Sequence, residues 1–114
     1  MFSGRQLFLY QDYFIEWYQQ LNGDVQEKVD WVLELVKTVD VIPQKYFKHI
    51  EGSDGLYEIR IEYKSNIYRV FCFFDKGNLI ILINAFQKKS QKTPLLQIEL
   101  ATRLKKQYFK EKET

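Results

Sequence analysis

The sequence of 114 residues contains one cysteine and one histidine, so several classes of site lack their building blocks. Cys72 has no internal disulfide partner and lies in the apolar run VFCFF, which indicates a buried small hydrophobic residue rather than a nucleophile. The chain has no cluster of Cys and His, no glycine-rich phosphate loop and no paired catalytic carboxylates. These absences argue against a metal centre, a nucleotide-binding loop and a glycosidase, and we expect no cofactor.

Long apolar segments are also missing. The longest run of Leu, Ile and Val covers residues 79–83, which is much too short to cross a membrane. The chain opens with no basic and apolar leader, and a lone cysteine suits a reducing compartment, so we expect a cytoplasmic protein with no membrane partner. A hydrophobic fraction of 46% over this length predicts one domain, residues 1–114, with a single core.

Charge is divided unevenly along the chain. The net charge is +2, but residues 1–54 carry 5 Lys and Arg against 9 Asp and Glu, whereas residues 55–114 carry 12 against 6. Residues 84–94 in the basic half read NAFQKKSQKTP and contain three closely spaced lysines. Such a charge run is often only a solvated loop, and a site that faces a polyanion is the alternative.

The first half shows helical spacing of apolar residues after a short strand expected at residues 6–10. One stripe contains Tyr13, Phe14, Trp17, Tyr18 and Leu21. Asn-Gly-Asp at 22–24 then breaks the helix, and we expect Asp24 to cap a second amphipathic helix that ends before Pro43. The loop before Leu56 is expected to carry no regular structure.

The second half alternates apolar and polar residues with a period of two, which is typical of antiparallel strands. We predict strands at 56–63, 66–74 and 78–86, with a two-residue turn at Ser65-Asn66 between the first two. A last helix should begin with Thr93 as N-cap and Pro94 as first residue.

These elements predict the α+β class. We expect a small antiparallel sheet of three or four strands, with two N-terminal helices on one face and one C-terminal helix near its end. On the last helix, a stripe of leucines repeats every four residues, and it includes Leu96, Leu100 and Leu104.

The turn at Ser65-Asn66 also predicts which residues pair. It places Glu62 opposite Arg69, and Arg69 opposite Asn84 on the third strand. One face of the sheet is then apolar and takes the N-terminal helices: Tyr57, Ile59, Ile61, Tyr68, Val70, Phe74, Leu79, Ile81 and Ile83. The other face has an apolar end and a polar end: Phe71, Phe73, Ile80 and Leu82 against Arg60, Glu62, Arg69, Asn84, Phe86 and Lys88.

Arg69 is the most informative residue of that polar end. A permanent charge in the middle of a sheet must lose water, so it needs Glu62, another partner or a ligand. A cross-strand pair with Glu62 that only holds the sheet together is the alternative to a functional site.

Several short elements in this order resemble the HigB branch of the RelE/ParE superfamily of bacterial toxins, which come from type II toxin–antitoxin pairs. The matching residues are Gly55, Leu56, Glu58 and Arg60; Tyr68, Arg69 and Phe71; Phe86, Lys88 and Lys89; Lys92, Thr93 and Pro94; and Ala101 and Arg103. The similarity covers nearly the whole chain.

The resemblance implies an endoribonuclease that cleaves mRNA on the ribosome without a metal, and that is held inactive by a cognate antitoxin, expected to be a helix-turn-helix protein. On this basis Arg60 and Arg69 are assigned to the scissile phosphate, Lys88 and Lys89 to transition-state charge or proton transfer, and Phe86 to stacking on a base. The other expected substrate contacts are Lys48, Lys64, Lys92 and Asn84.

The chain departs from one branch of the superfamily because it lacks a carboxylate and histidine acid–base pair. His49, the sole histidine, is expected in a loop, where a solvated residue is the ordinary case and a catalytic one the alternative. Two rival functions stay open: a ParE-like toxin that poisons DNA gyrase, and a non-catalytic domain that binds RNA or an antitoxin. We expect the antitoxin to cover either the basic site or the apolar end with Phe71, Phe73 and Leu82.

Overall fold

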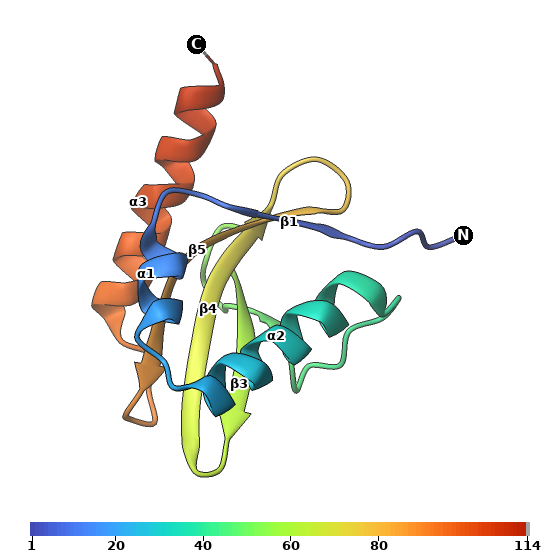
Figure 1. The fold of residues 1–114 in the computed structure, drawn as a ribbon. Coiled ribbons are helices and arrows are strands. Elements are labelled where there is room, and N and C mark those ends of the chain that lie inside the picture. Colours follow the sequence, from blue (N-terminus) through green and yellow to red (C-terminus); the bar gives the residue numbers. More distant parts are fainter. Residues whose placement is uncertain (114) are drawn as a thin grey trace.

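The computed structural model describes residues 1–113, which form a five-stranded sheet with helices on both faces (Figure 1). The elements in chain order are β1 (Gln6–Leu9), α1 (Tyr13–Gln19), α2 (Gly23–Thr38), β2 (Phe47–His49), β3 (Tyr57–Tyr63), β4 (Asn66–Phe74), β5 (Leu79–Lys88) and α3 (Leu95–Lys112). The strands lie in the order β1-β5-β4-β3-β2. Within residues 1–113, no helix is both long and apolar enough to cross a membrane.

The sheet has more strands than the sequence suggested, and one pair is parallel. The strand expected at 6–10 is confirmed as β1, but it runs parallel to β5, whereas all other pairs are antiparallel. β2 lies in the loop for which no regular structure was expected. This strand has only three residues and no readable alternation; it forms because it pairs with β3 and because the Phe47 ring stacks on Tyr57 at 5.0 Å between centroids.

One face of the sheet is covered by α1 and α2, as predicted. The α2 helix buries Val25, Val29, Val32 and Val36 against the sheet, and Phe14 of α1 joins the same cluster. The N-cap of α2 is Asn22, whose side chain accepts a hydrogen bond from the Val25 backbone N–H at 3.0 Å, so the assignment of Asp24 as N-cap was wrong. Asp24 lies instead in the first turn, where a negative charge interacts favourably with the helix dipole.

The other face is covered by α3 over part of its length (Figure 1). The helix buries Ala101, Leu104 and Tyr108 over the aromatic end of β4. It begins one residue later than expected, with Pro94 as the cap residue and no side-chain cap. Leu96 is 78% exposed, so the expected leucine stripe does not extend to the start of the helix.

The far end of α3 is tied to the turn between β4 and β5. The Asp75 carboxylate accepts hydrogen bonds from the Tyr108 hydroxyl at 2.7 Å and from the Lys112 ammonium at 2.5 Å. The Tyr10 hydroxyl also donates to Glu111 at 2.7 Å. These contacts hold the C-terminal half of α3 over the sheet.

The register between β3 and β4 differs by two residues from the prediction. Tyr63 pairs with Asn66, so the two turn residues are Lys64 and Ser65, and Lys64 adopts the positive φ of 56° that such turns require. Arg60 therefore lies opposite Arg69, and Glu62 does not. A shift of two preserves which face each side chain is on, so the two arginines still share a face as predicted.

A bulge between β4 and β5 changes the pairing partners of the β5 residues and also the face of the sheet on which some of their side chains lie. Val70 pairs with Ala85 and Cys72 with Leu82, so two residues of β5, Ile83 and Asn84, lie opposite Phe71. Residues 79–82 are therefore on the opposite faces from those predicted. Ile80 and Leu82 pack under α1 and α2, and Ile81 packs under α3. Ile83, at the bulge itself, also packs under α3.

Candidate functional site

A row of three residues crosses the centre of the sheet at the end that α3 leaves open. Arg60 of β3 lies opposite Arg69 of β4, which lies opposite Phe86 of β5. The Arg69 side chain is 4% exposed and the Arg60 side chain 29%. The sequence predicted that these three residues share one end of one face, and the structure brings them together there.

Glu58 joins the two arginines. Its Oε2 lies 3.2 Å from Arg60 Nε and its Oε1 lies 3.6 Å from Arg69 Nε. Glu62, the partner expected for Arg69, lies opposite Ile67 and is exposed. Glu58 was missed because the predicted register moved it away from Arg69; the signal was its position two residues before Arg60, on the same face of the same strand.

The cluster of Arg60, Arg69 and Glu58 has more positive than negative charges, and some of its buried donors lack a hydrogen-bond partner within residues 1–113. Two guanidinium groups share one carboxylate, so the three ion-paired side chains keep one excess positive charge. Arg69 Nη1 donates to the Tyr68 carbonyl at 3.1 Å, but the buried Nε atoms of both arginines have no hydrogen-bond partner within residues 1–113. Burial lowers the pKa of Arg69 and the Glu58 carboxylate opposes that effect, although a guanidinium stays charged in either case. This arrangement favours an anionic ligand.

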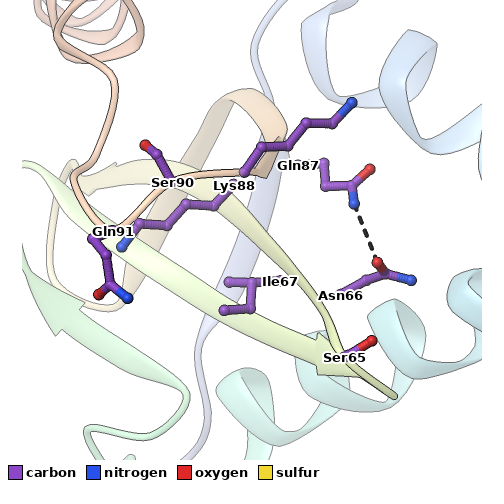
Figure 2. A pocket seen from close by; sticks show the side chains of 8 residues that line it. Ser65, Asn66, Ile67, Gln87, Lys88, Ser90 and Gln91 are labelled. Carbon is purple, nitrogen blue, oxygen red and sulfur yellow. Dashed lines mark hydrogen bonds between the residues drawn. The ribbon is translucent and has the colours of Figure 1, made fainter.

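Lys88 and Lys89 lie one step further along the strands. Lys88 pairs with Ile67, two residues beyond the pair of Arg69 and Phe86, in the next row on the same face of the sheet. Both lysines line a hollow of about 460 Å³ together with Ser65, Asn66, Ile67, Gln87, Ser90 and Gln91 (Figure 2). The hollow contains no carboxylate, so positive charge continues from the arginine pair towards the loop after β5.

Lys48 lies on the other flank of the arginine pair. It pairs with Glu58 across β2 and β3, and both residues line a second hollow of about 280 Å³ with Thr93 and Ile98 at the start of α3. The sequence placed His49 in a loop, whereas it belongs to β2. Its ring packs edge-on against Tyr57 at 5.2 Å, and Tyr57 packs with the cluster under α1 and α2. His49 also lines the hollow that contains Lys48 and Glu58.

Three other expected substrate contacts have different surroundings. Asn84 is 3% exposed, and its amide donates to the Gln97 carbonyl and to the Gln97 side chain at 3.1 and 2.9 Å, so it connects β5 to α3. The Lys64 ammonium lies 5.5 Å from the centre of the Tyr63 ring, which packs with the cluster under α1 and α2. Lys92 is exposed in the loop after β5.

Phe86 is placed in the predicted row, but its ring is buried. The residue is 8% exposed and its ring lies edge-on to Phe71 at 5.1 Å. It therefore contributes to the core under α3 and presents almost no surface on which a base could stack.

Neither a reactive cysteine nor a metal-binding cluster is found among residues 1–113. Cys72 is fully buried, and burial raises the pKa of its thiol, which agrees with the predicted structural role. Among residues 1–113, no group of three or more His, Cys, Asp and Glu side chains is arranged to hold a metal ion.

Residues 16–106 match the family described as "Phage derived protein Gp49-like (DUF891)". No curated protein shows significant similarity to the chain.

Solved structures share the fold at low identity. The free E. coli toxin RelE, in a form with two arginines changed to alanine, is 19% identical with a TM-score of 0.53, over 73% of this chain and 82% of that one. A chain of the RelB–RelE antitoxin–toxin complex from Methanococcus jannaschii is 18% identical with a TM-score of 0.53, over 76% and 99%. A chain of the RelE–RelB complex from Pyrococcus horikoshii OT3 is 15% identical with a TM-score of 0.55, over 80% and 100%. These likenesses confirm the predicted RelE-like α+β fold.

Proposed function

Since the chain belongs to the Gp49-like family and has the RelE-like fold, we propose that it is a HigB-type toxin of a type II toxin–antitoxin pair, which cleaves mRNA on the ribosome. The observation that carries this proposal is the arginine pair. Two guanidinium groups share Glu58 at the end of the sheet that α3 leaves open, and lysines lie on both flanks. A phosphodiester supplies the negative charge that this cluster lacks.

The chemistry needs only side chains of this chain and the substrate's own hydroxyl. The ribose 2′-oxygen attacks the adjacent phosphorus, the bond from phosphorus to the 5′-oxygen breaks, and the products are a 2′,3′-cyclic phosphate and a 5′-hydroxyl. The 2′-hydroxyl loses a proton and the leaving oxygen gains one. Fixed positive charges stabilise the phosphorane that forms between these steps.

The structure supports different roles for the two arginines. The Arg60 side chain is 29% exposed, so we assign it to direct contact with the phosphate. Arg69, opposite Arg60 on the neighbouring strand, is buried and adds charge while it holds Glu58 in place. Lys88 and Lys89 are assigned to transition-state charge or proton transfer, because both line the hollow next to the arginine row and neither takes part in an ion pair within residues 1–113.

The decisive experiment is to map transcript 5′ ends after induced expression of the wild type and of a folded variant with both Arg60→Ala and Arg69→Ala. We expect new 5′ ends on ribosome-bound transcripts for the wild type and their loss in the variant. Lys106→Ala, which removes a positive charge from an exposed part of α3, is the control and should cleave normally.

Other outcomes identify the rival functions. Full cleavage by the folded double variant contradicts the proposed site. Growth arrest with DNA breaks at gyrase and no new RNA ends indicates a gyrase poison. RNA binding without cleavage indicates a non-catalytic domain.

We also propose an antitoxin partner, since two of the related structures are antitoxin–toxin complexes. One of the two expected contact surfaces is excluded: Phe71 and Phe73 are 0% exposed under α3, and Leu82 is buried under the other helices. The polar end remains, and an antitoxin segment with carboxylates would compensate its excess charge. Co-expression of the neighbouring gene should restore growth; equal growth without it, when the toxin accumulates, argues against the pair.

A further inference from the structure

We infer that the hollow beside Lys88 is a pocket for a nucleobase, in which Ile67 and Gln91 contact the base next to the scissile phosphate. This inference rests on the proposed function, because it concerns the substrate of the same site. It assigns Ile67 and Gln91 a role in choosing the RNA sequence that is cut.

The position of the hollow follows from the strand pairing. Ile67 and Lys88 form the row next to Arg69 and Phe86 on the same face of the sheet. Two residues along a strand span about 7 Å, so a nucleotide whose phosphate lies at the arginine pair reaches the hollow with its neighbouring group.

The usual surface for a base is missing at the arginine row itself. Phe86 is buried against Phe71, as described above, and cannot receive a base. The half-buried Ile67 side chain is the next apolar surface on that face, and it lines the hollow. Single-stranded RNA is recognised through unstacked bases that rest on such a surface and bond through their edges.

Gln91 supplies the edge contacts. A carboxamide has both donors and acceptors, so it can pair with two neighbouring atoms on a base edge. Figure 2 shows Gln91 and Ile67 on the same side of the strand pair. The Ser90 hydroxyl donates to the Lys92 carbonyl at 2.9 Å, which is a contact within the loop that carries Gln91.

A second glutamine at the same strand end provides a matched control. Gln87 pairs with Tyr68, one residue out of phase with Ile67 and Lys88, so its side chain starts on the opposite face. Its amide donates to Asn66 at 3.3 Å, on the other side of the strand pair from Ile67 (Figure 2). Gln87 also lines the hollow, but from the side of the strand pair opposite Ile67, so Gln87→Ala removes the same chemical group from the side on which no base is proposed.

The first test is the sequence preference of cleavage. Ribosome-bound transcripts of random sequence are cut, and the frequency of each base around the cleavage site is counted. Gln91→Ala should reduce the preference for the best base over the worst at one position by about tenfold to a hundredfold, as expected for loss of a bidentate base contact. Ile67→Ala should act at the same position, and Gln87→Ala should leave the preference unchanged. An unchanged preference in Gln91→Ala, or an equal change in Gln87→Ala, overturns the inference.

The second test does not require cleavage. The wild type is titrated with each of the four nucleoside 3′-monophosphates and with inorganic phosphate, and the side-chain amide signals of Gln91 and Gln87 are followed by NMR. We expect the Gln91 signal to move with at least one nucleotide and not with phosphate, and the Gln87 signal to stay. Equal shifts with all five ligands, or no shift at Gln91, overturn the inference. If the wild type cleaves no RNA, the proposed function fails and this titration still decides the pocket.

Discussion

The two ends of the face under α3 are stabilised in opposite ways. At the covered end, Phe71 and Phe73 are 0% exposed and pack against Leu104 and Tyr108 of the helix. At the open end, Arg69 lies two residues before Phe71 on β4. It is buried, and its ion-pair partner is the Glu58 carboxylate, which it shares with Arg60. Buried apolar side chains stabilise the fold through many contacts that need no particular orientation. A buried ion pair depends on one partner of opposite charge. We therefore expect the covered end to contribute most to stability, while the open end carries the proposed activity.

The boundary between the two ends is set by where α3 begins. Leu95 and Leu96, at the start of the helix, are 67% and 78% exposed, so these two side chains do not pack over the arginine row. The bulge at Ile83 and Asn84 lies at this point, and the Asn84 amide donates hydrogen bonds to the Gln97 carbonyl and side chain in that first turn. The bulge that reverses the faces of β5 therefore also anchors the start of α3, the helix that covers the apolar end of this face.

The largest effect is expected at the covered end. Phe73→Ala should reduce the free energy of unfolding by about 3–5 kcal/mol, because it removes a fully buried ring and leaves a cavity. Urea denaturation measures this loss, and cleavage per folded molecule should not change. Leu96→Ala, at an exposed position of α3, should cost less than about 0.5 kcal/mol. A loss of cleavage in folded Phe73→Ala would show that the two ends are not independent.

At the open end, Arg60→Ala should reduce the cleavage rate by about a hundredfold to a thousandfold, since one such transition-state contact contributes about 3–4 kcal/mol. Arg69→Ala should reduce both cleavage and stability, because Arg69 is buried and Arg60 is not. Single-turnover cleavage on ribosomes and urea denaturation separate the two effects. Equal stability of the two variants would contradict the division of roles between the arginines.

Glu58→Ala should reduce the free energy of unfolding by about 3 kcal/mol, because it leaves the buried Arg69 without its paired carboxylate. Glu62→Ala is the control: this carboxylate is exposed, and its removal should cost less than about 1 kcal/mol. The measurement is urea denaturation of both variants at neutral pH. If Glu62→Ala is the more damaging change, the assigned partner of Arg69 is wrong.

Single replacement of Lys88 or Lys89 by Ala should slow cleavage by less than about tenfold, or about 1.4 kcal/mol of activation free energy. Flexible neighbouring ammonium groups can substitute for one another, unlike the fixed guanidinium groups. The double variant should lose more than the product of the two single effects. A simple product would indicate independent roles for the two lysines.

The smallest effect concerns the acid end of the pH range. Hydrogen bonds from Lys112 and Tyr108 lower the pKa of Asp75, which fixes the covered end. A carboxyl with a lowered folded pKa stabilises the fold fully above its unfolded pKa of about 3.9, and this contribution is lost as the pH falls through the folded pKa. The difference in unfolding free energy between the wild type and Asp75→Asn should therefore shrink between pH 5 and pH 3, to be followed by urea denaturation. A constant difference would contradict this linkage, and Glu27→Gln, exposed on α2, serves as the control.

Much of the fold could be predicted because local patterns carry it. The alternation in residues 57–63 and 66–74 predicted β3 and β4, and helical spacing predicted α1, α2 and α3. β2 could not be predicted, since three residues are too few for a period and the strand depends on β3. The position of Arg60 and Arg69 on one face was predictable, because any shift by an even number of residues keeps it.

The partner of Arg69 and the exposure of Phe86 were not predictable from the same patterns. Glu58 and Glu62 share a parity, and the turn at Lys64 and Ser65 makes both of them diagonal neighbours of Arg69, two residues to either side of Arg60. The three-dimensional arrangement of the side chains then decides that Glu58 meets the arginine. Phe86 looked accessible because the predicted register placed it beyond the aromatic end of the sheet. The bulge and the packing of Phe71 bury it instead.

The sequence by itself determined the three helices and the four strands other than β2, the basic second half and the common face of the two arginines, because each depends on local spacing or composition. Only the tertiary structure decided the register, the reversal of faces at Ile83 and Asn84, the sharing of Glu58, and the hollow beside Lys88. The physical reason is that several strand pairings, with or without a bulge, are compatible with the same local pattern. Contacts between residues far apart in the chain decide between these pairings, and no local pattern records them.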